Sequence, residues 1–275
     1  MIKEQDKIVN KLFSYSFIDL PHTICLQGDI GCGKHTLIND LADKHHVEVE
    51  DISDKLSFDD IMDIYSNPEP KFYIIDFISM DNRKSVSVQN SLLKLLEEPP
   101  LLIKLFILIE PNPEIDLLNT IKNRCQSFLF EPYSIYFLKD IANLNDEQFD
   151  FFYKAGYNTP GKLLEVDLND EDFKKLPDII NNIILNISRA NVPNTLTLIK
   201  HIKSKENDAC PYTLKVFLTA LENGYVDKCI EDPQNFTYYM KQYLKIHECR
   251  KKLIFSSNDD KILFENLLLE LKGVV

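Results

Sequence analysis

The stretch Gly28-Asp29-Ile30-Gly31-Cys32-Gly33-Lys34-His35-Thr36 decides the fold class of this chain. It contains three of the seven glycines in the sequence. An apolar run at residues 23–26 precedes it and a helical pattern at residues 37–42 follows, which is the strand–loop–helix context of a phosphate-binding P-loop. Glycines let backbone N–H groups turn toward phosphate oxygens, and the N-terminus of the helix adds positive potential. The residues expected to contact phosphates are Gly28, Gly31, Gly33 and Lys34.

Two positions depart from the pattern of a hydrolysing P-loop protein. His35 stands where a Ser or Thr hydroxyl normally binds Mg²⁺, although Thr36 offers a hydroxyl one position later. Asp76 ends an apolar run at residues 72–76, as expected for a strand-end carboxylate that holds Mg²⁺ through water. The next residue is Phe77, where hydrolysing members usually carry a Glu that activates water. The sequence therefore indicates a nucleotide-binding frame without hydrolysis. It leaves open whether ATP and Mg²⁺ bind, or whether the loop is only a tight turn.

Alternating strands and helices up to about residue 131 predict an α/β fold with a parallel sheet. The expected strands are 23–27, 47–49, 72–76, 106–109 and 127–130. The expected helices are 3–19, 35–44, 57–65, 85–98 and 114–122. After Pro132 no run is typical of a strand. Residues 134–168 predict a small helical unit, and residues 170–275 predict about five helices with polar breaks at 190–194, 204–211, 230–235 and 255–260.

Composition excludes several classes of protein. The 275 residues, 44% of them hydrophobic, can form two or three small domains. A net charge of −12 argues against a basic nucleic-acid clamp. The six cysteines have no paired short spacing, so they predict neither a zinc site nor disulfides and fit a reducing cytoplasm. No apolar run is long enough to span a membrane, and the charged N-terminus is unlike a signal peptide. We expect a cytoplasmic protein.

Three further segments, together with the glycine loop, point to a family. Asn90-Ser91-Leu92-Leu93-Lys94-Leu95-Leu96-Glu97-Glu98-Pro99-Pro100 resembles the NxLLKxLEEPP helix of DNA-polymerase clamp-loader subunits. Leu117-Leu118-Asn119-Thr120-Ile121-Lys122-Asn123-Arg124-Cys125-Gln126 resembles their LLPTIxSRCQ segment. Residues 258–268 resemble the last helix of the collar in these proteins. The chain thus resembles a bacterial-type clamp-loader subunit of the AAA+ class, and is most similar to the delta-prime subunit of DNA polymerase III.

The resemblance implies a role for Arg124. In the family, this arginine reaches the ATP site of the neighbouring subunit, where it stabilises charge on the transferred phosphoryl group. Asn123 replaces the Ser that usually precedes it. The alternative is an ordinary arginine that caps the C-terminus of a helix. The resemblance also places Gly161 where hydrolysing relatives carry a nucleotide-sensing arginine, which is a third sign that hydrolysis is absent. The zinc-binding cysteines of the family are missing, so no zinc is expected.

The resemblance further implies three domains and a set of partners. Residues 1–131 would form an AAA+ nucleotide-binding core, residues 132–168 a helical lid and residues 169–275 a helical collar that mediates oligomerisation. The implied partners are other clamp-loader subunits, the sliding clamp and primed DNA, with no membrane. The resulting hypothesis is a clamp-loader subunit that contributes Arg124 in trans to a ring that loads the clamp, without hydrolysing ATP itself.

Several alternatives stay open. The chain could be an active motor subunit of the same machine, as the retained glycines and Lys34 favour. It could also be a stand-alone P-loop enzyme such as a nucleotide kinase, which would leave the match at residues 90–100 unexplained. The charged residues Lys94, Glu97 and Glu98 are either a solvated helix face or a contact with DNA or the next subunit. A basic stretch at residues 241–252 poses the same choice.

Overall fold

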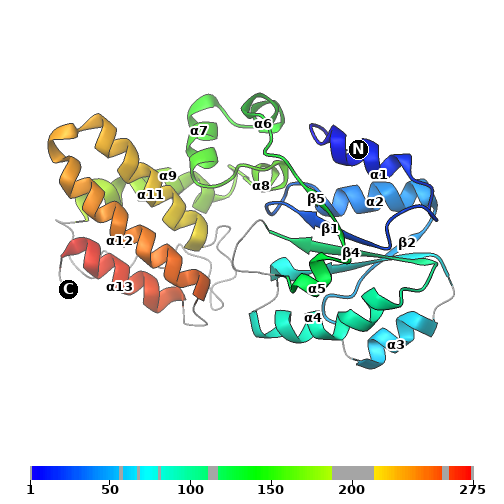
Figure 1. Ribbon diagram of the computed structural model, residues 1–275. Helices are drawn as coiled ribbons and strands as arrows, with labels where there is room; N and C mark the ends of the chain where they lie inside the picture. The colour runs from blue at the N-terminus through cyan, green and yellow to red at the C-terminus, as the bar shows by residue number, and fades with distance from the viewer. Residues whose placement is uncertain are drawn as a thin grey trace. The chain divides into compact units, whose positions relative to one another are not determined.

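The computed structural model describes residues 2–55, 58–66, 69–79, 82–110, 117–187, 214–255 and 260–273. The chain forms two compact units (Figure 1). The first comprises Met1–Phe137 together with Thr159–Gly161, and the second comprises Leu138–Asn158 and Lys162–Val275. The first unit carries the sheet, and the second is built from helices.

The first unit is built on a five-stranded parallel sheet with the order β2-β3-β4-β1-β5. Its strands are β1 (Thr23–Gln27), β2 (Glu48–Asp51), β3 (Lys71–Asp76), β4 (Ile103–Ile109) and β5 (Gln126–Leu129). Cys25 of β1 pairs with Ile107 of β4 on one side and with Ser127 of β5 on the other. Because every strand runs in the same direction, the carboxyl ends of the strands gather at one edge. The glycine loop after β1 and Asp76 at the end of β3 therefore lie at the same edge.

Helices cover both faces of this sheet, as a parallel sheet requires. On one face lie α1 (Asp6–Ser14) and α2 (Lys34–His45), and on the other lie α3 (Phe58–Ser66), α4 (Asn82–Glu97) and α5 (Asn119–Lys122) (Figure 1). A short 3-10 helix, η1 (Phe77–Ser79), follows β3. All seven residues of β4 are buried, which explains its nearly continuous apolar sequence.

The predicted α/β sheet and the helical region after it are confirmed, but several element boundaries were wrong. The first helix covers Asp6–Ser14 rather than 3–19, because the Ser16 hydroxyl donates to the Asp19 carboxylate at 2.6 Å and forms a turn before Pro21. Strand β4 begins at Ile103 rather than at residue 106. The predicted helix 114–122 begins at Asn119 within the described residues, and residues 111–116 lie outside them.

The chain after the sheet is helical throughout its described part. The helices are α6 (Ile135–Ile141), α7 (Asp146–Lys154), α8 (Pro160–Leu164), α9 (Glu171–Asn186), α11 (Leu214–Glu231), α12 (Phe236–Phe255) and α13 (Asp260–Lys272), with a 3-10 turn η3 (Pro233–Asn235). Asn145 begins α7 with a capping box, since its side chain accepts from the Gln148 amide at 2.8 Å. The predicted breaks at 190–194 and 204–211 lie outside the described residues. Among the described helices, none combines the length and apolar character needed to cross a membrane.

Candidate functional site

The glycine loop lies between β1 and α2, as the sequence predicts. Gly31 and Gly33 have φ angles of +77° and +99°, in the left-handed region that favours glycine, and Gly33 occupies the position before the first residue of α2. Gly28 is closely packed, because an added Cβ would lie 2.6 Å from Cys32 Sγ and 2.8 Å from Phe130 Cβ. The loop therefore requires glycine at all three positions.

Lys34 is turned into its own loop. The residue is only 5% exposed, and its Nζ donates to the Gly28 carbonyl, to the Asp29 carbonyl at 2.9 Å and toward Cys32 Sγ at 3.7 Å. The ammonium group that was expected to reach outer phosphates thus satisfies backbone acceptors of the loop. In this arrangement Lys34 stabilises the loop itself.

The chain's own residues pack onto the glycine loop. The Gly161 amide donates to the Gly31 carbonyl at 2.9 Å, and the Thr159 hydroxyl donates to the Ile30 carbonyl at 2.7 Å. A Cβ at Gly161 would lie 2.7 Å from Gly31 Cα, so there is no room for any side chain at this position. The predicted loss of a nucleotide-sensing arginine at Gly161 therefore coincides with a backbone contact that excludes one.

Two more residues close around the loop. The Tyr133 hydroxyl donates to the Cys32 carbonyl at 2.7 Å, and burial raises the pKa of Tyr133 well above its usual range. Ile2 packs so close to Gly33 that an added Cβ there would lie 3.0 Å from its Cδ1 atom. Neither residue was predicted to contact the loop. No local pattern in the sequence marks Ile2 or Tyr133, since both come from segments outside the P-loop stretch.

His35 and Asp76 are brought together. The Nε2 of His35 lies 3.6 Å from an Asp76 carboxylate oxygen, while the other Asp76 oxygen accepts from the Ile78 amide at 2.9 Å. Thr36 is exposed on the first turn of α2, and Phe77 is fully buried in the core beneath the sheet edge. The histidine thus meets the carboxylate that was expected to serve Mg²⁺, and the buried phenyl ring offers no acceptor for a proton.

These groups do not fit a Mg²⁺–ATP hydrolysis site. Lys34 is engaged by loop carbonyls, and the backbone of residues 159–161 lies on Gly31 and Ile30. His35 supplies an imidazole where Mg²⁺ prefers oxygen ligands. Phe77 replaces the water-activating carboxylate. In this structure the glycine loop connects β1 with α2 and contacts the turn at 159–161.

Arg124 lies at the junction of α5 and β5, and the two contacts of its side chain given below do not involve the glycine loop. One terminal nitrogen, Nη1, donates to the Thr120 carbonyl at 2.9 Å, and the other, Nη2, donates to Glu97 Oε1 at 2.9 Å. The Arg124 side chain is 36% exposed and that of Glu97 is 54% exposed. The helix-capping alternative therefore describes one of the contacts of Arg124, while the guanidinium remains at the surface.

The charged face of α4 is partly used inside the first unit. Lys94 Nζ lies 5.8 Å from the ring centroid of Tyr65 and 3.7 Å from Met62 Sδ, both on α3. Glu97 pairs with Arg124. Part of the basic stretch of α12 is likewise engaged in contacts within the second unit, since Lys245 donates to the Glu270 carbonyl and Arg250 pairs with buried Glu222. These residues make contacts within their own units, while Lys241, Lys251 and Lys252 of the same stretch are exposed.

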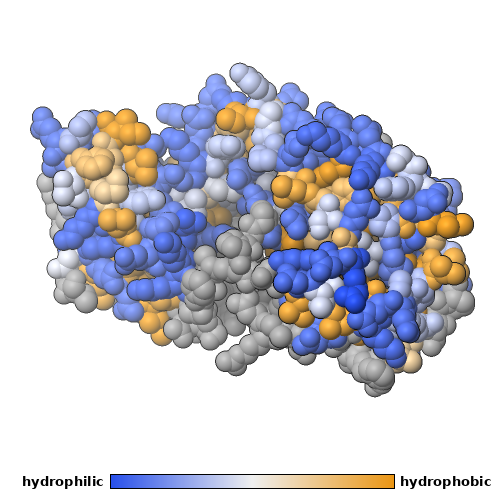
Figure 2. Space-filling model, viewed as in Figure 1, coloured by the Kyte–Doolittle hydropathy of each residue, from blue (hydrophilic) through white to orange (hydrophobic). Residues whose placement is uncertain are grey.

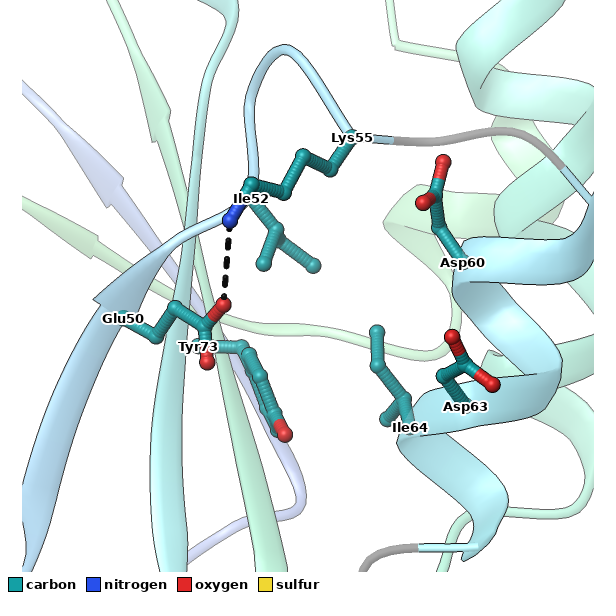
Figure 3. Close-up of a pocket in the computed structure, with 7 residues that line it drawn as sticks. All are labelled: Glu50, Ile52, Lys55, Asp60, Asp63, Ile64 and Tyr73. Carbon is teal, nitrogen blue, oxygen red and sulfur yellow. Dashed lines mark ion pairs between the residues drawn. The ribbon is translucent and has the colours of Figure 1, made fainter.

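A cavity of about 270 Å³ opens beside the sheet between β2, β3 and α3 (Figure 3). Helix α3 contributes Asp60, Asp63 and Ile64 to one wall, and the opposite wall carries Glu50, Ile52, Lys55 and Tyr73. Lys55 lies 3.5 Å from Glu50, whose pKa is lowered chiefly by a hydrogen bond from Lys71. None of the residues predicted for nucleotide binding lines this cavity. No sequence pattern marks it beyond two carboxylates one helical turn apart, Asp60 and Asp63.

The comparisons with known proteins agree with the resemblance in the sequence. Residues 42–134 match a family described as DNA polymerase III, delta subunit. This range includes Asp76, α4 and Arg124 but not the glycine loop. Among curated proteins, none matches this chain significantly.

Two proteins of Thermotoga maritima are among the solved structures similar to this chain. A DNA polymerase III gamma subunit-related protein is 15% identical with a TM-score of 0.46, over 98% of this chain and 99% of the other. A RuvB variant is 17% identical with a TM-score of 0.46, over 86% of this chain and 78% of the other. Over residues 42–134, the chain is thus similar to the family of DNA polymerase III delta subunits.

Proposed function

We propose that this chain is a delta-prime-like subunit of a clamp loader that contributes Arg124 in trans and does not hydrolyse ATP itself. The match of residues 42–134 to the DNA polymerase III delta-subunit family supports the coarser statement, a clamp-loader subunit of DNA polymerase III. The finer statement rests on the closed glycine loop and on the surface position of Arg124. Its partners would be other clamp-loader subunits and, through them, the sliding clamp and primed DNA.

The observation that carries the absence of hydrolysis is the state of Lys34. Its buried ammonium group is bonded to the carbonyls of Gly28 and Asp29. A phosphate group would have to displace these bonds and the backbone of Gly161 that lies on Gly31. Even a nucleotide that achieved this would find Phe77 where a carboxylate is needed to activate water. Both the cost of opening the loop and the missing base therefore argue against ATP hydrolysis by this chain.

A guanidinium suits the proposed role of Arg124. It is planar, always charged and able to bridge two phosphate oxygens, so lysine should replace it poorly. A trans-acting arginine is worth about 10³ to 10⁵ in rate at the site it completes. Arg124 remains exposed while bonded to Glu97 and Thr120, which supports an interaction with a neighbouring subunit.

We further propose the division into core (1–131), lid (132–168) and collar (169–275), with assembly through the collar. Apolar side chains recur at helical spacing in this segment. Of these, Ile183, Ile184, Leu267 and Leu268 are buried inside the second unit, whereas Ile179 and Leu263 are half-buried. Assembly would therefore use mainly exposed residues. Apolar side chains gather on the surface where α11 leads into α12 (Figure 2), and the exposed residues there include Val226, Ile230, Phe236 and Tyr238.

Steady-state ATP hydrolysis tests this proposal. The isolated chain should show no turnover above background, with or without primed DNA. In a clamp-loader complex reconstituted with its partner subunits, Arg124→Ala should lower DNA-stimulated hydrolysis, and Arg124→Lys should restore little of it. Lys122→Ala is the matched control, because it removes a cation from the same exposed turn. Robust turnover by the isolated chain that vanishes on Lys34→Ala would instead identify a motor subunit, and equal hydrolysis by wild type and Arg124→Ala would reject the trans role.

A further inference from the structure

We propose that Glu97 is a positioning residue for Arg124: its carboxylate holds the guanidinium in the orientation from which it would reach a phosphate of the neighbouring subunit. The inference rests on the proposed trans role of Arg124. It gives a role to one residue of the charged face of α4. From the sequence alone, this face could be either a solvated surface or an interface. The contact that carries it is the 2.9 Å bond between Arg124 Nη2 and Glu97 Oε1.

The backbone that bears Arg124 is fixed by buried packing. Leu117 and Ile121, 2% and 0% exposed, lie in the same hydrophobic core as Leu92 and Leu95 of α4. The side chain of Gln89, also on α4 and 2% exposed, accepts from the Leu118 amide at 2.6 Å. Helix α4 therefore sets the position of the segment that leads to Arg124. What this packing leaves undetermined is the direction of the long arginine side chain.

Glu97 and Thr120 determine that direction. The Thr120 carbonyl accepts from Nη1 and the Glu97 carboxylate accepts from Nη2, so both ends of the guanidinium fork are held. An arginine side chain has large rotamer entropy, and ordering it before it meets its target lowers the cost of the encounter. Gln89 and Glu97 both belong to α4. The same helix thus fixes the backbone through a buried amide and the side chain through a surface carboxylate.

The geometry favours a brace over a lock. Each terminal nitrogen makes one contact, and a guanidinium carries five N–H donors, so the two bonds do not use the whole fork. Arg124 can therefore bind a phosphate oxygen while it keeps Glu97. A lock would require a bidentate pair that has to break before the arginine can act. Because both side chains are partly exposed, the effect on rate should be modest, about two- to fivefold.

The test uses the reconstituted clamp-loader complex with ATP and primed DNA. Glu97→Gln keeps the size of the side chain and removes its charge, and Glu98→Gln is the matched control on the neighbouring exposed residue. We expect Glu97→Gln to lower kcat about two- to fivefold with KM for ATP unchanged, and Glu98→Gln to change neither. In an Arg124→Ala background, Glu97→Gln should have no further effect, because it acts through the arginine. Thermal unfolding of each isolated variant checks that the fold is kept.

The outcomes separate the inference from the proposed function. Hydrolysis by Arg124→Ala at the wild-type rate would overturn the trans role and the inference with it. A loss of rate in Arg124→Ala without a loss in Glu97→Gln would overturn the inference alone. An equal effect of Glu97→Gln with and without Arg124 would reduce Glu97 to a structural residue. A higher rate in Glu97→Gln would identify a lock and reject the brace.

Discussion

The Gly161 amide donates a hydrogen bond to the carbonyl of Gly31, a residue far from it in the sequence, at 2.9 Å. The two backbones are so close that a Cβ on Gly161 would lie 2.7 Å from the Gly31 Cα and 3.0 Å from its carbonyl oxygen. Neither atom belongs to a flexible side chain that could move away. The glycine loop of this protein thus binds backbone from its own chain.

The first prediction concerns this contact. Gly161→Ala should destabilise the protein by about 2 kcal/mol, because the new methyl group overpacks against backbone. Urea unfolding in the absence of nucleotide measures the effect. Leu164→Ala, which shortens a side chain that is 70% exposed on the same helix α8, is the control and should stay within about 0.5 kcal/mol of wild type. An unchanged midpoint for Gly161→Ala would mean that the turn at 159–161 is not seated on the loop.

The second prediction concerns Lys34. In a protein that binds nucleotide, replacing this lysine mainly weakens ligand binding. Here Lys34→Met should lower the free energy of unfolding by about 1 to 3 kcal/mol without any ligand, since the carbonyls of Gly28 and Asp29 lose their buried donor. Chemical unfolding of both proteins provides the measurement.

A matched ligand experiment distinguishes the two interpretations of Lys34. Millimolar Mg²⁺–ATP should leave the unfolding midpoint of the wild-type chain unchanged, because a ligand stabilises only a state that it binds. A rise in the wild-type midpoint that disappears in Lys34→Met would contradict the closed-loop interpretation.

The third prediction concerns pH. The pKa of His22 is lowered to about 4, first by burial and then by the charge of Lys104, while a hydrogen bond with the Pro100 backbone acts weakly in the opposite direction. The unfolded chain takes up a proton near pH 6.5, whereas the folded chain does so only near pH 4. The stability present above pH 6.5 is therefore lost as the pH falls through this window.

Because His22 is partly exposed, the loss should be about 1 to 2 kcal/mol rather than the full value of the shift. The test is to measure the urea midpoints of wild type and His22→Gln at several values between about pH 7 and about pH 4, the window in which the loss is expected. The variant should lose less stability across the window. Parallel curves for the two proteins would exclude His22 as the source. His45, whose pKa is lowered chiefly by burial, contributes in the same direction.

The sheet was largely predictable because burial on both faces of a parallel strand leaves a continuous apolar run, as in β3 and β4. Strand β2 was less predictable, because it is a polar strand at the edge of the sheet, next to β3. Backbone hydrogen bonds rather than apolar side chains define its extent to Asp51. The residues of the glycine loop were found from local spacing. What the sequence could not show is that Lys34 turns inward and that Gly161 covers Gly31, because these contacts depend on how distant segments meet.

Arg124 illustrates the same limit. Arg124 was singled out from the local segment at residues 117–126. Its partner Glu97 lies on another helix, and no spacing rule links the two residues. The C-terminal helices were predicted from the periodicity of their apolar residues, yet periodicity cannot tell an internal core from an interface. Ile183 and Leu267 are buried within their own unit. Interfaces must therefore be sought among exposed residues such as Ile230.

The last prediction concerns a buried carboxylate in the second unit. Glu222 of α11, 7% exposed in its side chain, lies 2.9 Å from Arg250 Nε and 3.2 Å from His247 Nδ1, both on α12. Removing Arg250 would leave a buried carboxylate that His247 compensates only in part. Arg250→Met should therefore lower the free energy of unfolding by about 3 kcal/mol, whereas Lys251→Met, which removes an exposed neighbouring cation, should have little effect.

The double variant Glu222→Met with Arg250→Met decides whether the ion pair itself or the unpaired carboxylate is responsible. If the cost comes from stranding Glu222, replacing both residues by apolar side chains of similar size should recover most of the stability. Urea unfolding of the two single variants and the double variant forms a complete thermodynamic cycle. Recovery would mean that the ion pair contributes more to the alignment of α11 with α12 than to the stability of their packing. A double variant no more stable than Arg250→Met would instead show that the charged contact contributes net stability to the packing of these two helices.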